Sequence, residues 1–312
     1  MKKIAILIPC YNEEEVINET AKRLKDKINS LVKAHNIHTD SKIIFIDDGS
    51  RDRTWQIIEE LHKSDSLFGG IKMSRNYGHQ NTLLGGLMNL KDKFDAIISI
   101  DADLQDDINA IDEMIEKYSQ GAEIVYAVRK ERQTDSFFKR HTALAFYNLM
   151  KNMGVNLVYN HADYRLMTSR ALNELAKFEE VNLFLRGIVP LLGFTTEQVY
   201  YDRAKRFAGE SKYPLRKMLN FAIDGITSFS IKPLRLITSL GFFITALSII
   251  MATYLVIMKI IGATAQGLSF IAISIWLIGG VQMISLGVIG EYIGKIYSET
   301  KARPRFIVEK KI

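Results

Sequence analysis

The sequence predicts an α/β domain with a mostly parallel sheet, followed by a two-helix transmembrane hairpin. In the first two thirds of the chain, short apolar runs that end in turn or acidic residues alternate with helical stretches, as in a doubly wound sheet. Further along, residues 236–258 and 268–290 contain no charged side chain. Each of these two runs is long enough to cross about 30 Å of hydrocarbon as a helix. A soluble domain seldom contains two such helices that are apolar all round.

Turn or acidic residues end each expected strand. The first apolar run stops at Pro9, the second stops at Asp47-Asp-Gly-Ser50, and a third stops just before Asp101. Helical patterns lie between the runs, which favours parallel pairing of the strands. The expected strands are 4–8, 42–46, 96–98 and 124–128, and the expected helices are about 14–34 and 54–64.

Polar side chains follow three of these strands, and in a parallel sheet such strand ends form one ligand-binding edge. Tyr11 can stack on a base, and Asn12 and Glu13 can form hydrogen bonds to a nucleotide. Asp47 or Asp48 can accept a hydrogen bond from a base imide or a ribose hydroxyl. The sequence therefore predicts a nucleotide site at this edge.

Asp101 and Asp103 stand one residue apart just after the strand at 96–98. Carboxylate oxygens are the ligands that hard divalent cations such as Mg²⁺ and Mn²⁺ prefer. A cation held there would meet the diphosphate of a nucleotide-sugar. A dinucleotide-binding domain is excluded because no Gly-x-Gly-x-x-Gly follows the first strand. Gly85-Gly86 lies in a helical stretch and is assigned to close packing.

The charges around the two apolar runs indicate how the chain crosses the membrane. Lys232 and Arg235 precede the first run, and only Lys259 lies between the two. Because positively charged flanks stay in the cytoplasm, the large domain and both termini are expected at the cytoplasmic face of the cell inner membrane. The basic residues after the second run are Lys295, Lys301, Arg303, Arg305, Lys310 and Lys311.

The net charge of +6 does not indicate a nucleic-acid-binding protein. Much of the excess lies beside the apolar runs and near the C-terminus, where anionic lipid headgroups explain it better. The single Cys10 cannot form an internal disulfide, and no Cys/His grouping has zinc spacing. Both observations agree with a catalytic domain in the cytoplasm.

Five motifs occur in the order found in family 2 glycosyltransferases. Over nearly its whole length the chain resembles the polyprenyl-phosphate sugar transferases of that family, which include dolichol-phosphate mannose synthases and bactoprenol glucosyltransferases. The motifs are Pro9-Cys-Tyr-Asn-Glu13, Asp47-Asp-Gly-Ser50, Ser74-Arg-Asn-Tyr-Gly78, Asp101-Ala-Asp-Leu-Gln-Asp106 and Asp163-Tyr-Arg-Leu-Met167.

The resemblance implies a GT-A fold, an inverting transfer, and an Mg²⁺ or Mn²⁺ ion between carboxylate and diphosphate. Asp101 and Asp103 would hold this metal and the sugar-diphosphate, and Gln105 would lie near the transferred sugar. Asp106-Asp107 departs from relatives with His-Pro or Pro-Pro there, and we interpret it as a solvated helix start. The residues implied in the nucleotide site are Pro9, Tyr11, Glu13, Asp47 and Asp48.

Asp163 has two interpretations. A lipid monophosphate has a second pKa of about 6 and is mostly a dianion at neutral pH, so its oxygen is a nucleophile without a general base. Asp163 either positions the acceptor or the sugar, with some base character, or forms an ion pair with Arg165. The expected catalytic residues are Asp103, Gln105 and Asp163.

A basic strip before the first apolar run is the candidate acceptor site. Arginine binds phosphate through two parallel hydrogen bonds, so Arg206 is the first choice, supported by Lys212. Arg129, which follows the strand at 124–128, is a weaker candidate for the nucleotide diphosphate. The expected acceptor phosphate-binding residues are Arg203, Arg206, Ser211 and Lys212.

These features divide the chain into four parts. Segment 213–235 is amphipathic and lies either in the membrane interface or in the core of the soluble domain. Gly279-Gly280, Gly287 and Gly290 in the second span permit close helix contact and thus a homo-oligomer. The parts are a catalytic domain (1–212), a juxtamembrane segment (213–235), the hairpin (236–294) and a basic cytoplasmic tail (295–312).

The expected function is hexose transfer from a nucleotide-sugar, preferably UDP-glucose, to a polyprenyl phosphate for cell-envelope glycosylation. UDP-GlcNAc, UDP-galactose and GDP-mannose stay open as donors, because one or two hydrogen bonds decide between them. A processive polysaccharide synthase is disfavoured because neither Trp55 nor Trp276 lies in a Gln-x-x-Arg-Trp motif. A membrane receptor that senses nucleotide-sugars would not need Gln105, Asp163 and the basic strip together.

Overall fold

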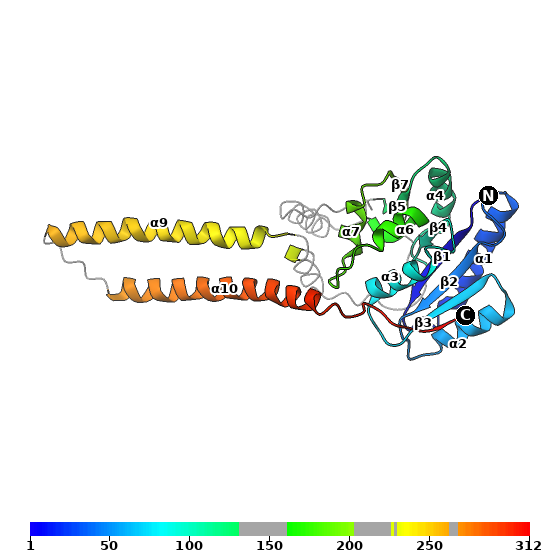
Figure 1. Ribbon diagram of the computed structural model, residues 1–312, viewed down its shortest axis with the longest axis horizontal. Coiled ribbons are helices and arrows are strands. Elements are labelled where there is room, and N and C mark those ends of the chain that lie inside the picture. Colours follow the sequence, from blue (N-terminus) through cyan, green and yellow to red (C-terminus); the bar gives the residue numbers. More distant parts are fainter. Residues whose placement is uncertain (131–160, 203–225, 228–229, 262–267) are drawn as a thin grey trace.

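The structure is a computed structural model that describes residues 1–130, 161–202, 226–227, 230–261 and 268–312. Figure 1 shows an α/β domain from which two long helices extend next to each other. Both ends of the chain lie on the α/β domain.

Within the described residues, eight strands form one mixed sheet. They are β1 (Ile4–Cys10), β2 (Lys42–Asp47), β3 (Phe68–Met73), β4 (Ala96–Ser99), β5 (Ile124–Arg129), β6 (His161–Thr168), β7 (Thr196–Tyr201) and β8 (Val308–Lys311). Their order is β7-β5-β6-β4-β1-β2-β3-β8. The central pairs β4–β1, β1–β2 and β2–β3 are parallel, as is β5–β7, whereas β6 and β8 run antiparallel to their neighbours. The four expected strands are confirmed.

Alternate residues of the central strands point to opposite faces, and helices cover both. Ile6 and Ile8 of β1 pack in one apolar cluster, and Ala5 and Leu7 pack in the other. This double burial explains why the strands read as continuous apolar runs. The first cluster includes α1 (Ile17–Lys33), α2 (Thr54–Ser64) and α4 (Ala110–Ser119), and the second includes α3 (His79–Leu90), α6 (Ser169–Leu175) and α7 (Leu185–Leu191).

Helix α3 lies very close to the sheet because of its two adjacent glycines. A Cβ atom at Gly86 would lie 2.7 Å from Cδ2 of Leu7, and one at Gly85 would collide with the side chain of Met73. The assignment of Gly85-Gly86 to close packing is confirmed. This packing sets the position of His79 at the start of α3, which matters for the site below.

The C-terminal residues are not a separate tail. After the second long helix the chain returns to the domain, where β8 pairs antiparallel with β3 at the edge of the sheet. Phe306 packs into one apolar cluster and Ile312 packs against the other. The separate tail expected at 295–312 is therefore wrong: its first residues continue helix α10, and its last residues form an edge strand whose charged side chains suit an exposed edge.

The two long helices are α9 (Lys232–Ile260) and α10 (Leu268–Thr300). Both are long and apolar enough to cross a membrane, and the candidate spans within them have no buried residues. Helix α9 begins before 236 and α10 runs beyond 290, so part of the expected juxtamembrane segment and tail is helical. Residues 213–225 lie outside the described residues. A Cβ at Gly279, Gly280, Gly287 or Gly290 would meet no described atom within 4 Å, and oligomerisation stays a prediction.

Candidate active site

Three polar loops begin at one edge of the sheet. The register of β1 and β2 pairs Cys10 with Asp47, and that of β1 and β4 pairs Leu7 with Ser99. The segments that follow these strands, at 11–14, 47–52 and 101–107, therefore start side by side. Pro9 lies at this end of β1, opposite Ile46. The three polar loops thus start at the same end of the sheet, as expected, and ligand binding there stays a prediction.

The first two loops are hydrogen-bonded to each other. The backbone N–H of Asn12 donates to Ser50 Oγ at 2.9 Å, and the N–H of Arg51 donates to Asn12 Oδ1 at 2.9 Å. The N–H of Glu13 donates to Thr54 Oγ1. Asn12 adopts a left-handed backbone with φ of 54°, which asparagine tolerates better than most residues. Asn12 thus joins the loops, while Tyr11 stays exposed and open to stacking.

The two aspartates at the end of β2, Asp47 and Asp48, are buried and accept hydrogen bonds from backbone N–H groups. Both oxygens of Asp47 accept from the N–H of Ser50, and burial raises the pKa of Asp47. Asp48 accepts from the N–H groups of Tyr77 at 2.7 Å and Gly78 at 3.0 Å. Asp48 therefore fixes the Ser74–Gly78 motif, and a direct contact of either carboxylate with nucleotide stays a prediction.

Burial alternates along the loop after β4. Asp101, Asp103 and Gln105 are partly exposed, whereas the residues between and after them, Ala102, Leu104 and Asp106, are buried. The alternation leaves the two carboxylates and one amide accessible from outside. Leu104 has a φ of 55°, which is unfavourable for a leucine, and the N–H of Gln105 donates to Asp103 Oδ1 at 3.1 Å.

The donor set suits a hard divalent cation. Burial raises the pKa of Asp101 to about 6, and a bound cation would favour its charged form. Among the described residues, no three His, Cys, Asp or Glu side chains are grouped closely enough to hold a metal by themselves. Two carboxylates need further oxygen ligands, and a bound diphosphate can supply them.

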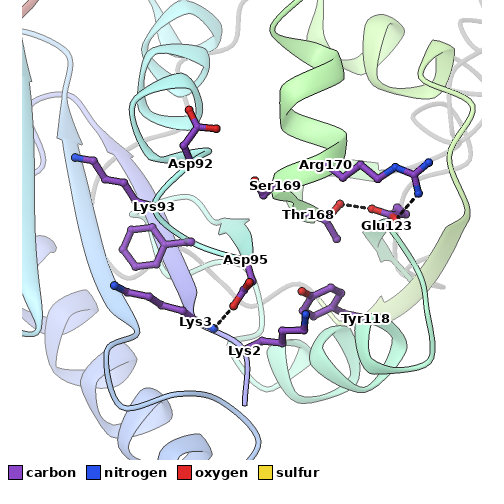
Figure 2. Close-up of a pocket in the computed structure, with 11 residues that line it drawn as sticks. Lys2, Lys3, Asp92, Lys93, Asp95, Tyr118, Glu123, Thr168, Ser169 and Arg170 are labelled. Carbon is purple, nitrogen blue, oxygen red and sulfur yellow. Dashed lines mark hydrogen bonds and ion pairs between the residues drawn. The ribbon is translucent and has the colours of Figure 1, made fainter.

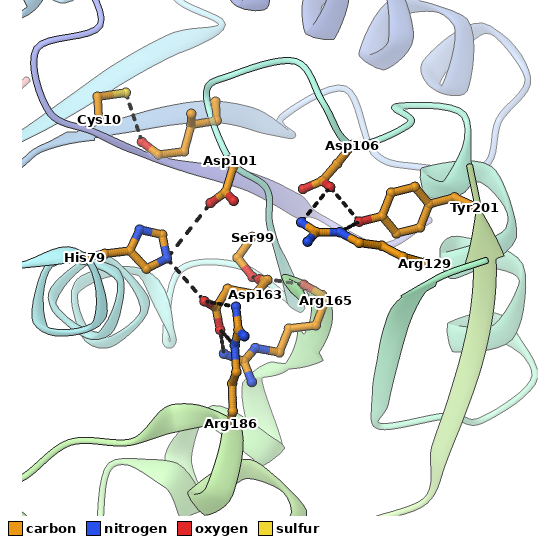
Figure 3. Close-up of polar contacts among 11 residues, drawn as sticks. Cys10, His79, Ser99, Asp101, Asp106, Arg129, Asp163, Arg165, Arg186 and Tyr201 are labelled. Atoms are coloured by element: carbon orange, nitrogen blue, oxygen red, sulfur yellow. Dashed lines mark hydrogen bonds and ion pairs between the residues drawn. The ribbon is translucent and has the colours of Figure 1, made fainter. Parts of the chain in front are cut away.

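Asp106 is buried, so its interpretation as part of a solvated helix start is wrong. The hydroxyl of Tyr201 donates to Asp106 Oδ1 at 2.5 Å, and Arg129 Nη2 lies 3.3 Å from the same oxygen. Arg129 Nε also donates to the Tyr201 hydroxyl (Figure 3). The ends of β5 and β7 thus anchor the loop that carries Asp103, and Arg129 is part of this anchor.

Asp163, on β6, lies between His79 on one side and Arg165 and Arg186 on the other (Figure 3). Arg165 Nη2 is 3.2 Å from Asp163 Oδ1, and Arg186 Nη2 is 3.2 Å from Oδ2. His79 Nε2 is 3.4 Å from Oδ2 and 3.9 Å from Asp101 Oδ1. Burial alone would raise the pKa of Asp163, but Arg186, His79 and Arg165 together hold it well below its ordinary value. The ion pair with Arg165 is confirmed.

No sequence motif indicated Arg186, and His79 lies just after a motif without belonging to it. Arg186 lies on α7, whose position depends on α3: the N–H of Leu185 donates to Gln80 Oε1 at 2.9 Å. That contact joins residues 105 positions apart, so no local pattern could reveal it. The expected acceptor residues Arg203, Arg206, Ser211 and Lys212 lie outside the described residues.

The comparison with known proteins assigns the chain to a family. The sequence model for "Glycosyl transferase family 2" matches residues 5–176. This chain belongs to glycosyl transferase family 2. Its mixed sheet with helices on both faces, followed by two apolar helices, is the GT-A domain and hairpin that the sequence predicts.

Several family 2 relatives match almost the whole chain. An "Uncharacterized glycosyltransferase YkoT" of Bacillus subtilis is 51% identical over 306 residues, which cover 98% of this chain and 91% of that protein. A "Bactoprenol glucosyl transferase" of Shigella phage SfX is 40% identical, covering 98% of this chain and 99% of that protein. A solved mannosyltransferase of Pyrobaculum calidifontis, with GDP-Man and Mn²⁺, is 11% identical with a TM-score of 0.47, covering 95% and 85%.

Proposed function

We propose that this family 2 glycosyltransferase transfers a hexose, with inversion, from a nucleotide-sugar to a polyprenyl phosphate at the cytoplasmic face of the cell inner membrane. UDP-glucose is the first choice of donor. The observation that carries the proposal is the 40% identity, over 98% of the chain and so including the helical hairpin, to a protein named for glucosyl transfer to bactoprenol. Identity across the hairpin matters because a lipid acceptor is presented at a membrane.

The exposed side of the Asp101–Gln105 loop is the donor side of the site. Asp101 and Asp103 would hold Mg²⁺ or Mn²⁺, and Gln105 would contact the sugar. When bound, the cation would neutralise the charge that develops on the leaving diphosphate. Tyr11 is exposed for stacking on the base, and the buried Asp47 and Asp48 keep the surrounding loops in place.

Asp163 is better suited to positioning than to proton removal. A carboxylate whose pKa is held well below its ordinary value is a weak base, and Asp163 already pairs with two arginines. The reaction does not need a base, since a phosphate monoester dianion carries no proton at the attacking oxygen. We therefore assign Asp163 a positioning role.

The alternatives differ in what is made. UDP-GlcNAc, UDP-galactose or GDP-mannose would give the same lipid-linked product with another sugar. A processive synthase would give polymer, and a nucleotide-sugar sensor would give no product.

The test is a panel of radiolabelled nucleotide-sugars incubated with membranes that contain the full chain and undecaprenyl phosphate. We expect label from UDP-glucose in an acid-labile, chloroform-soluble lipid. Label in insoluble polymer, or in no product with any donor, would overturn the proposal. Label from another donor in the same lipid fraction would change only the sugar.

A further inference from the structure

A single carboxylate, that of Asp163, faces three nitrogen-bearing side chains. Arg165 and Arg186 both donate to its Oδ1, and Arg186 also donates to Oδ2. His79 Nε2 approaches the same Oδ2. Nε and Nη1 of Arg165 are buried and find no acceptor within the described residues. Asp163 alone therefore does not satisfy the buried N–H donors of Arg165 within the described part of the chain.

The exposed part of this cluster is its basic part. The side chains of Asp163 and Arg165 are 10% and 1% exposed. Those of Arg186 and His79 are 34% and 43% exposed. An approaching ligand would therefore meet a guanidinium and an imidazole above a buried carboxylate. Arginine in such a position suits the oxygens of a phosphate, to which it can donate two parallel hydrogen bonds.

The cluster borders the donor side of the site without being part of it. His79 Nε2 lies 3.9 Å from Asp101 Oδ1, and the Asp101 charge is assigned to the metal and donor diphosphate. An anion bound by Arg186 and His79 would thus lie next to the donor. The cation and its two carboxylates, Asp101 and Asp103, would lie on the donor's side of this anion. An attacking phosphate and a leaving diphosphate need such separate binding groups because they repel each other.

We propose that Arg186 and His79 bind the phosphate monoester of the acceptor, and that Asp163 positions them. This inference rests on the proposed function. In the transfer, a phosphate oxygen forms a bond to the anomeric carbon while the bond from that carbon to the diphosphate breaks. The electron pair leaves with the nucleoside diphosphate, and no proton moves.

The experiment compares Arg186→Gln and His79→Gln in the detergent-solubilised full chain. The KM for polyprenyl phosphate should rise by about tenfold or more, since each change removes a hydrogen bond to a charged group, and the KM for the nucleotide-sugar should stay within about twofold. Matched controls are Arg170→Gln and His38→Gln. Arg170 is exposed beside Glu123, in a pocket at the opposite end of the strands, where β1 and β4 begin (Figure 2). His38 is 44% exposed, and its Nδ1 lies 3.7 Å from Asp40 Oδ2.

A second readout measures binding without turnover. Isothermal titration with a short-chain polyprenyl phosphate, inorganic phosphate and UDP should show that the variants lose the lipid phosphate and keep UDP. If the variants lose inorganic phosphate as fully as they lose the polyprenyl phosphate, the cluster recognises the phosphate headgroup alone. Loss of UDP binding, or a raised donor KM with an unchanged acceptor KM, would assign the cluster to the donor diphosphate and overturn the inference.

Two outcomes are kept apart by design. If the wild-type chain transfers sugar to no polyprenyl phosphate, the proposed function fails whatever the variants do. If the wild type is active and the variants keep the wild-type acceptor KM, only this inference fails. Arg186→Lys keeps a charge opposite Asp163 and covers the case in which Arg186→Gln does not fold. It should raise the acceptor KM to a smaller extent than the glutamine variant, at an unchanged melting temperature.

Discussion

Asp163 neutralises the positive charge of Arg165, which is buried away from water. Arg165 is 1% exposed, and its described ion-pair partner is Asp163 at 3.2 Å. A buried ion pair is weak evidence for stability, but removing one partner leaves the other charge buried and uncompensated. Asp163 therefore has a structural role in addition to its place beside Arg186 and His79.

The change Asp163→Asn should lower the free energy of unfolding at pH 7 by about 3–5 kcal/mol, because it leaves Arg165 without a counter-charge. The folded-state pKa of Asp163 is lowered, so its contribution is present above the unfolded-state pKa and is lost as the pH falls. The difference between wild type and variant should shrink below about pH 4. Thermal unfolding of the detergent-solubilised chain from pH 7 to pH 3 measures this, and an equal difference at all pH values would contradict it.

Sequence patterns predict some site residues and not others, for a physical reason. Asp101 and Asp103 follow an apolar run directly, so their place at a strand end depends on local pattern alone. The partners of Asp106 are 23 and 95 positions away, and two adjacent aspartates before a helix suggest a solvated start. His79 and Arg186 both approach Asp163, and the hydrogen bond between Leu185 and Gln80 that joins α7 to α3 has no counterpart in sequence spacing.

Among the elements, the Asp101–Asp107 loop depends on the strands β5 and β7 for its shape. Leu104 is in a left-handed conformation, which costs roughly 1–2 kcal/mol for a residue with a side chain. Asp106 accepts hydrogen bonds from Tyr201 and Arg129, and these bonds fix the part of the loop that follows Leu104. The position of Asp103 and Gln105 therefore depends on groups that do not face the donor.

Tyr201→Phe should lower the stability by about 3 kcal/mol or more, because it removes two hydrogen bonds of the hydroxyl, one with Asp106 and one with Arg129, and both partners are charged. It should also raise the donor KM several-fold while the acceptor KM changes little, because the Asp103–Gln105 loop loses an anchor. Steady-state kinetics with each substrate varied in turn measures the split.

The matched control for that change is Tyr200→Phe. Tyr200 is 55% exposed, and its hydroxyl donates to Gln198 on the same strand. We expect wild-type constants for this variant. If the two phenylalanine variants behave alike, the Asp106 anchor does not position the donor loop.

Whole strands were predictable where apolar residues are continuous, as in β1 and β2. The edge strand β8 was not, because three of its four residues, Glu309, Lys310 and Lys311, are charged. Charged residues on an edge strand protect it from pairing with other chains. The same charges therefore concealed the strand in the sequence.

At the scale of the whole molecule, the second long helix is joined to the catalytic domain at its C-terminal end. Glu299 accepts from the N–H groups of Val181 and Asn182, each at 2.8 Å. Arg305 then donates to the carbonyl of Phe178 at 2.8 Å. These contacts hold the segment just before α7, which carries Arg186, so the apolar hairpin and the basic cluster are mechanically connected.

Deleting residues 306–312 should lower the melting temperature by several degrees and reduce transfer, while the chain still partitions with membranes through α9 and α10. The deletion removes β8 and the contact of Phe306 with α3. Thermal unfolding and membrane flotation measure the two effects. Lys310→Ala, which removes only a surface ion pair with Glu59, should change stability by less than about 1 kcal/mol. An unchanged melting temperature in the deletion variant would contradict the assigned role of β8.

The most direct test of the central claim is the mass of the product formed by the purified full chain from UDP-glucose, Mg²⁺ and undecaprenyl phosphate. We expect a lipid with the mass of undecaprenyl phosphate plus one hexose, and no such lipid from Asp103→Ala. Free glucose as the sole product would contradict the account, as would polymer, or a lipid product of equal yield from Asp103→Ala.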